Sequence, residues 1–201
     1  MKQLGYFCIF LCLMNTPAFS EVAPQPDTSK NARHSIQLSP VGIISATLAA
    51  NYEFLLMRRQ GLFLEGSYTF PLFPNSRGYG VGIHYRFHFQ PRMNSKYVGA
   101  FFRTVYIKSV IANAENRIIT NHDYSLKLNV PGINYGWRSR FFKTRFNYDF
   151  RLGLGVPFVT LTWGKNGRPE SISGVMSTST FEKMLKYSSL LDFDFCIGYS
   201  L

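Results

Sequence analysis

The C-terminal stretch from Leu191 to Leu201 reads Leu-Asp-Phe-Asp-Phe-Cys-Ile-Gly-Tyr-Ser-Leu. Every odd position carries a large apolar or aromatic side chain, and every even position carries a small or polar one. Because successive side chains of a β-strand point to opposite faces, this alternation predicts a strand with one apolar face and one polar face. A transmembrane strand tilted by about 45° needs roughly 9–11 residues to cross the hydrocarbon layer, and this stretch is long enough. A strand of a soluble β-protein would show the same alternation, usually over roughly 5–6 residues.

The beginning of the chain predicts export. Residues 1–20 combine a positive charge at Lys2, a short apolar core and an exit of small residues, which is typical of a secretory signal peptide. The apolar core is too short for a membrane-spanning helix, so insertion into a membrane would require a closed β-barrel. Residues 21–34 are polar and contain two prolines, which predicts a disordered periplasmic leader. Residues 35–201 are expected to form the barrel.

The composition favours a single all-β domain. Aromatic residues make up 16% of the 201 residues, charged residues also make up 16%, and 16 residues are glycine. The formal net charge of +11 raises the question of nucleic-acid binding. The basic residues fall in turns, however, and no recognition motif accompanies them. We therefore expect no nucleic-acid partner and favour anionic lipid headgroups as the counterpart of this charge.

The pattern of the terminal stretch recurs along the chain. The segment from Tyr79 to Gln90 shows it most clearly, because six large apolar side chains alternate with a face that carries His84, Arg86 and His88. Such a strand suits lipid on its outside and a polar lumen on its inside. Strands are predicted at 35–40, 45–57, 62–70, 79–90, 96–110, 124–137, 144–157 and 191–201. The predicted fold is therefore an all-β, eight-stranded antiparallel up-and-down transmembrane β-barrel.

Three connections have particular features. Residues 111–121 are predicted to form a polar loop, and residues 138–143 a basic turn. In residues 164–189, Ser179 and Glu182 have the spacing of a capping box, which predicts a short helix.

Two of the predicted strands contain irregularities. The sixth strand changes its apolar phase at Pro131-Gly132, which predicts a β-bulge. The seventh strand either ends at Pro157 or continues, bent, to Trp163.

Several segments carry a family resemblance. Residues 32–54, the run Tyr85-Arg86-Phe87-His88-Phe89 with the nearby Tyr97-Val98-Gly99, and the end of the chain from Ile197 resemble an uncharacterised family of small bacterial outer-membrane β-barrels. The resemblance implies an architecture similar to OmpX and the OmpA membrane domain, and it brings no activity. It also implies that the barrel-assembly machinery reads the last strand through Phe193, Phe195, Ile197, Tyr199 and Leu201. Leu201 departs from the aromatic residue that such signals prefer.

The polar faces of the predicted strands define a candidate site inside the barrel. An eight-stranded barrel is just wide enough to be filled by side chains or to hold one small ligand. Because buried charges are tolerated only when paired, the near balance of five acids and four arginines predicts a closed, side-chain-filled lumen without cofactor or metal. The predicted network consists of Glu53, Glu65, His84, Arg86, His88, Arg103, Arg145, Asp149, Arg151, Asp192 and Asp194.

We expect a non-enzymatic protein of the Gram-negative outer membrane, with a structural or surface-interaction role. It is expected to be monomeric and to contact outer-membrane lipid, including lipopolysaccharide. One alternative is a lipid-modifying barrel enzyme, an acyltransferase or deacylase. Its local candidates, His122 and Ser125, are three residues apart and would point to opposite faces of a strand. The other alternative is a secreted, soluble, small-ligand-binding β-barrel.

Overall fold

The computed structural model describes residues 33–40, 47–70, 76–91, 93–115, 118–141, 144–169, 171–172 and 176–201. All of them belong to one compact unit that begins at Asn31. The predicted signal peptide and nearly all of the predicted leader lie outside the described residues. His34, which the prediction assigned to the leader, is the first residue of β1.

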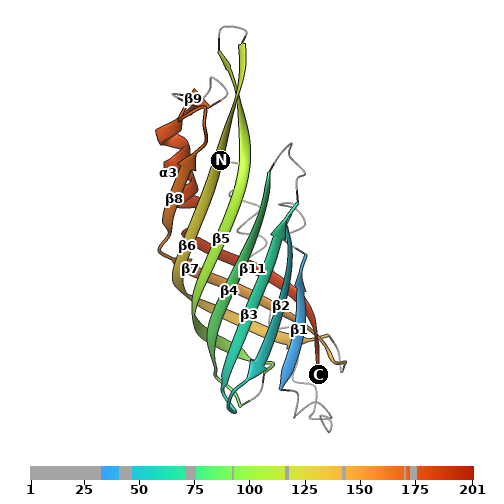
Figure 1. The fold of residues 1–201 in the computed structure, drawn as a ribbon. Coiled ribbons are helices and arrows are strands. Elements are labelled where there is room, and N and C mark those ends of the chain that lie inside the picture. The colour runs from blue at the N-terminus through green and yellow to red at the C-terminus, as the bar shows by residue number, and fades with distance from the viewer. Residues whose placement is uncertain are drawn as a thin grey trace, which may run out of the picture. The chain divides into compact units, whose positions relative to one another are not determined.

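The strands form one closed antiparallel barrel, which confirms the predicted all-β, eight-stranded architecture (Figure 1). Neighbours in sequence pair in order, and β1 pairs with β11 while β5 pairs with β6, so that the sheet closes on itself. Closure leaves no free sheet edge around the barrel wall. The eight strands are β1 (His34–Ser39), β2 (Thr47–Leu55), β3 (Gln60–Thr69), β4 (Arg77–His88), β5 (Lys96–Glu115), β6 (Ile118–Arg140), β7 (Phe146–Gly155) and β11 (Leu191–Ser200).

The seventh strand continues past Pro157. β7 pairs with the part of β6 from Gly132 to Arg140, and β8 (Phe158–Trp163) pairs with the next part, from Tyr124 to Asn129. Proline has no N–H for the ladder. The pairing with β6 is interrupted between Gly155 and Phe158, where the Val156 N–H donates to the Pro131 carbonyl at 2.8 Å. The chain therefore follows β6 beyond the barrel wall and forms an extension of β5, β6 and β8 (Figure 1).

The predicted polar loop at 111–121 is wrong. β5 runs to Glu115 and β6 begins at Ile118, and the two strands pair residue by residue along that whole length. The predicted basic turn at 138–143 is also too long, because β6 includes Arg138 and ends at Arg140. Backbone hydrogen bonds between the two strands of a hairpin can continue after the apolar pattern has stopped. A prediction based on polarity alone therefore makes β5 and β6 too short.

The predicted β-bulge in the sixth strand is also wrong. Phe102 pairs with Pro131 and Phe101 with Gly132, without an extra residue on either strand. Leu126 and Val130 are buried, and they have the same even phase as Asn134, which is also buried. The apolar side chains before Pro131 therefore point into the barrel, and the strand does not change face.

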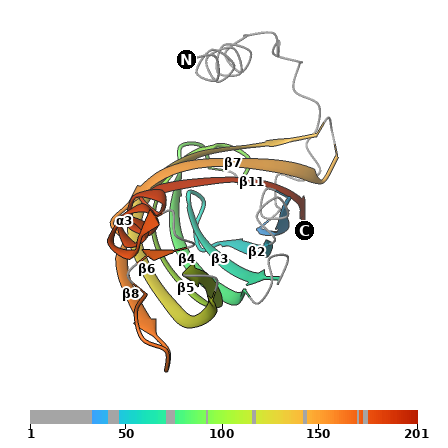
Figure 2. The same ribbon diagram turned by 90° about the horizontal axis from the view of Figure 1, so that it is seen from above.

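The long connection between β8 and β11 contains the predicted helix. α3 (Thr178–Ser188) follows a small hairpin of β9 (Ser171–Ile172) and β10 (Met176–Ser177). Its N-cap is Ser177, whose Oγ accepts a hydrogen bond from the Thr180 N–H at 3.3 Å, and not the predicted Ser179. Phe181 of α3 packs edge-on against Tyr124 of β6, which holds the helix against the extension (Figure 2). Among the described residues, no helix is long and apolar enough to cross a membrane.

The barrel has the reverse polarity of an ordinary soluble domain. Its buried side chains include the carboxylates Glu53, Asp149 and Asp192 together with arginines and histidines, whereas its outer wall exposes large apolar groups on every barrel strand. On β4, for example, Tyr79, Val81, Ile83, Tyr85 and Phe87 are all exposed, and each alternates with a glycine or a buried polar residue. The barrel wall therefore presents a mainly apolar face outward and a mainly polar face inward.

Candidate functional site

The barrel interior contains two groups of paired charges. The first, the Glu53 cluster, joins Glu53 and Asp149 to Arg86 and Arg138. The second, the Glu65 cluster, joins Glu65, Asp192 and Asp194 to Arg103 and Arg151. Together they place five carboxylates against four guanidinium groups, and each charge has a partner of opposite sign.

The Glu53 cluster is completely enclosed. Arg86 Nη1 donates to Glu53 Oε2 at 2.8 Å and to Asp149 Oδ2 at 2.7 Å. Arg138 Nη2 donates to the same two oxygens at 2.5 and 3.0 Å. All four side chains are at most 2% exposed. Because the residues come from β2, β4, β6 and β7, the cluster links strands on opposite sides of the barrel.

Aromatic and hydroxyl groups complete the surroundings of this cluster. The Tyr97 hydroxyl donates to Asp149 Oδ1 at 2.7 Å, and His88 Nε2 lies 3.1 Å from Glu53 Oε1. The guanidinium of Arg86 stacks on Tyr97, with its carbon 4.3 Å from the ring centroid. Gly136 lies opposite Tyr97 on β6, and a Cβ at that position would overlap the tyrosine ring. The glycine therefore makes room for a side chain that fixes Asp149.

The Glu65 cluster centres on Arg151. Its Nη2 lies 3.1 Å from Glu65 Oε2 and 3.2 Å from Asp194 Oδ2, and its Nε lies 3.0 Å from Asp192 Oδ2. Arg103, on β5, pairs with the same Glu65 and Asp192. Arg103 is 24% exposed, so this cluster has more access to solvent than the Glu53 cluster.

The ring of Phe63 contacts both clusters. The guanidinium carbon of Arg86 is 3.7 Å from the Phe63 centroid, and that of Arg151 is 5.3 Å from it. His84 packs edge-on against the same ring, and its Nε2 lies 3.3 Å from Glu65 Oε2. A fully buried aromatic ring thus fills the space that the charged groups leave.

The structure places ten of the eleven predicted residues in these contacts and leaves out Arg145. Arg145 precedes β7 and is exposed, so its predicted place in the network is wrong. Arg138 occupies the corresponding role. The prediction omits Arg138 because it ends the sixth strand at Trp137, whereas β6 runs to Arg140. The even phase of Asn134 and Gly136 would have identified it, since Arg138 is the next residue of that phase.

The residues of the predicted assembly signal lie along one face of the last strand. Phe193, Ile197 and Tyr199 are exposed, and Phe195 is half-buried on the same side of β11. Leu201 follows the last residue of β11 and its backbone N–H donates to the His34 carbonyl at 2.9 Å. The end of the chain is therefore part of the seam where the barrel closes.

The enzyme candidates are separated. His122 is buried and its Nδ1 lies 3.1 Å from the Gly167 carbonyl oxygen, whereas Ser125 has the opposite phase on β6. Within the described ranges, no three His, Cys, Asp or Glu side chains form a group that could hold a metal ion. Cys196 is buried and donates to Asp194 Oδ2 at 3.1 Å.

A comparison with known protein families identifies the family of the chain. The profile of a family described as "Protein of unknown function (DUF3575)" matches residues 10–175, which is most of the chain. No curated protein and no solved structure matches.

Removal of Arg138 tests the energetic role of the Glu53 cluster. We expect Arg138→Gln to lower the free energy of unfolding by roughly 3–5 kcal/mol, because it leaves two buried carboxylates with a single shared arginine. The measurement is urea unfolding of the refolded barrel followed by tryptophan fluorescence. Arg145→Gln, which removes the same charge from an exposed position, should change stability little. Equal effects of the two substitutions would contradict the assigned network.

Proposed function

The chain belongs to a family of proteins of unknown function, DUF3575, and because this family supplies no activity, we propose a function from the barrel itself. The protein is an outer-membrane β-barrel with a closed polar lumen, and it acts as a structural or surface-interaction component of the Gram-negative envelope. It is monomeric and non-enzymatic. The observation that carries this proposal is the reversed polarity of the barrel wall.

The exposed apolar wall supports a hydrocarbon environment. Ile133 is 68% exposed, and Leu152 and Leu154 on the neighbouring strand are 52% and 62% exposed. Soluble monomers rarely expose contiguous apolar patches larger than a few hundred Å². Here such residues surround the barrel, and the interior is occupied by ion pairs. This distribution also argues against a soluble ligand-binding barrel, whose interior would be apolar and whose outer face would be polar.

Aromatic residues stand at both margins of the apolar wall. At one margin, Tyr79 and Tyr106 pack with ring centroids 5.5 Å apart. At the other margin, Trp137 and Phe141 each pack against Tyr148. Girdles of aromatic residues at the two membrane interfaces are a feature of outer-membrane barrels, because their rings are apolar and their polar edges are hydrated.

The connections support an orientation. β2 and β3, β4 and β5, and β6 and β7 are joined at the end of the barrel where β1 begins and β11 ends, and each of these connections is short. The β5–β6 hairpin and the connection that carries α3 lie at the opposite end. Since outer-membrane barrels have short periplasmic turns and longer external loops, the extension of β5, β6 and β8 faces the exterior.

The interior supports a closed lumen. The Glu53 cluster, Phe63 and Tyr97 span the barrel with side chains that are almost completely buried. Because every charge in the two clusters has a partner, an ion entering the lumen would have to break existing pairs. The proposed work of the protein therefore lies at its ends and at its lipid-facing wall. Its partners are outer-membrane lipid and lipopolysaccharide, with the barrel-assembly machinery during biogenesis.

A charge on the outer wall tests the membrane proposal. We expect Ile133→Arg to destabilise the barrel in phospholipid vesicles by about 2–4 kcal/mol, since arginine near the bilayer midplane costs that much in a transmembrane barrel. The measurement is equilibrium unfolding from the vesicles. Met184→Arg, on exposed α3 beyond the barrel wall, is the matched control and should have little effect. Exposed positions of a soluble protein tolerate such changes, so equal and small effects would contradict the proposal.

Planar-bilayer recording tests the closed lumen. The purified barrel should insert without producing large, stable conductance steps, because the two clusters and Phe63 block the passage. Insertion is verified in parallel by heat-modifiable migration of the same preparation on a gel. Stable steps from correctly folded protein would show a continuous pore and would contradict the closed lumen.

A further inference from the structure

The outer wall changes from apolar to basic on three adjacent strands, β4, β5 and β6. On β4, the outward series of Tyr79, Val81 and Ile83 is continued by Arg77. On β5, Lys108 follows Tyr106 in the outward phase, and on β6 Lys127 lies directly opposite Tyr106. Arg77, Lys108 and Lys127 are all exposed and form what we call the basic margin. Arg77 and Lys108 lie beyond the aromatic pair of Tyr79 and Tyr106 along their strands, and Lys127 lies beside that pair.

The basic margin contains an unfavourable arrangement of charges. Arg77 and Lys108 are direct partners in the β4–β5 register. Like charges directly opposite each other destabilise a sheet. Lys108 Nζ lies 5.8 Å from the centroid of the Tyr106 ring, and in the part of the chain that the structure describes none of the three cations forms an ion pair with a carboxylate. Within the described residues, the margin is therefore a concentration of positive charge without ion pairs of its own.

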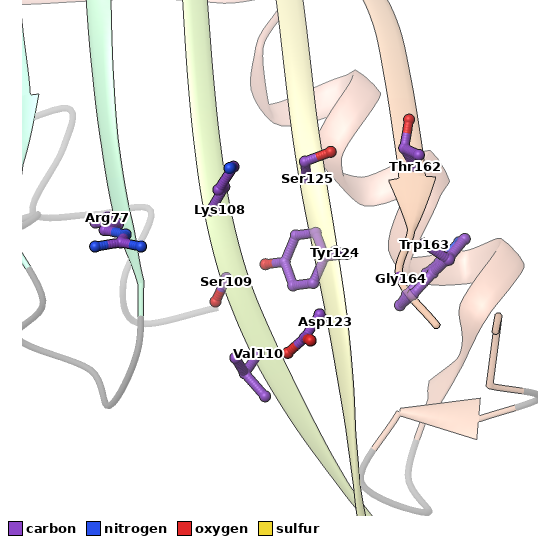
Figure 3. A pocket seen from close by; sticks show the side chains of 10 residues that line it. All are labelled: Arg77, Lys108, Ser109, Val110, Asp123, Tyr124, Ser125, Thr162, Trp163 and Gly164. Carbon is purple, nitrogen blue, oxygen red and sulfur yellow. The ribbon is translucent and has the colours of Figure 1, made fainter. Parts of the chain in front are cut away.

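A hollow of about 740 Å³ adjoins the basic margin. Figure 3 shows Arg77 on β4, Lys108 on β5, Ser125 on β6 and Thr162 on β8 side by side across its wall. Lys108 pairs with Ser125, and Ser125 pairs with Thr162, so the cations and the two hydroxyl groups share one face of the sheet. Cations and hydroxyl donors in this arrangement can bind phosphate oxygens. Asp123 also lines the hollow and offsets one positive charge at most.

We infer that the basic margin binds the phosphate groups of an anionic lipid whose acyl chains lie along the apolar wall. This inference rests on the proposed function, because the apolar wall must face hydrocarbon for the margin to lie at headgroup height. The aromatic pair marks the interface, where Lys127 lies beside Tyr106, and Arg77 and Lys108 occupy the next outward position beyond it, where lipid phosphates are found. The three cations of the basic margin and the single carboxylate of Asp123 leave a net charge of about +2. This charge matches a headgroup with two phosphates better than a headgroup with a single negative charge.

Native mass spectrometry tests this site with a matched pair of lipids. The full mature barrel, folded in a zwitterionic detergent, is titrated with lipid A that carries two phosphates and with the same lipid after removal of both. We expect the phosphorylated lipid to bind at least about tenfold more tightly, since basic residues near a membrane surface each contribute substantially to anionic lipid binding. Inorganic phosphate at the same concentrations should not compete, because the acyl chains contribute to binding through the apolar wall.

Charge-matched variants locate the binding. Arg77→Gln/Lys108→Gln/Lys127→Gln should lose the preference for phosphorylated lipid, whereas Lys165→Gln/Lys183→Gln/Lys186→Gln, with the same change in net charge, should keep it. Heat-modifiable migration on a gel verifies that each variant is folded. If the triple variant does not fold, the single variant Lys108→Gln is tested in its place.

The outcomes separate the two proposals. A folded wild-type barrel that binds both lipids equally, an equal loss in both triple variants, or competition by inorganic phosphate would overturn the lipid site and leave the membrane proposal intact. A wild-type chain that gives no heat-modifiable barrel in any detergent or bilayer would overturn the membrane proposal itself.

Discussion

Two buried carboxylates, Glu53 and Asp149, share the same two arginines at the centre of the barrel. A carboxylate removed from water is stable only when cations and hydrogen-bond donors replace its hydration. Arg86 and Arg138 supply these donors from β4 and β6, and each is itself enclosed. Because each member needs the others, the four strands that carry them must adopt one register relative to each other. The rest of the barrel is built around this requirement.

The ion pairs also explain the outer wall. In a β-strand, the two neighbours of a residue that points inward both point outward. An interior filled by paired charges therefore leaves the large apolar residues outside, as β4 and β11 show. Such a wall is unfavourable in water and favourable in hydrocarbon. The proposed outer-membrane location thus supplies the environment that the inner network makes necessary. The basic margin is the place where this wall meets the lipid headgroups in our proposal.

Most of the fold is predictable from the sequence, because polar and apolar residues alternate clearly in strands whose two faces differ strongly in polarity. The predicted bounds lie within two residues of those of β4 and within one of those of β11. The polar phases identify ten members of the inner network, include Arg145 wrongly and leave out Arg138. The errors came where the contrast between the faces is weak. The β5–β6 hairpin continues through polar residues, since pairing of the two backbones does not require an apolar face. Leu126 and Val130 are apolar and point inward, so their phase suggested a bulge that the one-to-one pairing excludes. The basic margin is not part of the prediction, because it depends on the register that brings residues of three strands together.

The most direct test of this account measures what surrounds the barrel wall. A single tryptophan is placed at Leu152, on the outer face, or at Phe63, in the interior, after Trp137 and Trp163 have been replaced by phenylalanine. The account predicts that lipids with brominated acyl chains quench the fluorescence of the tryptophan at position 152 and leave that at position 63 unchanged. Quenching at position 152 by aqueous iodide, without an effect of the brominated lipids, would contradict it.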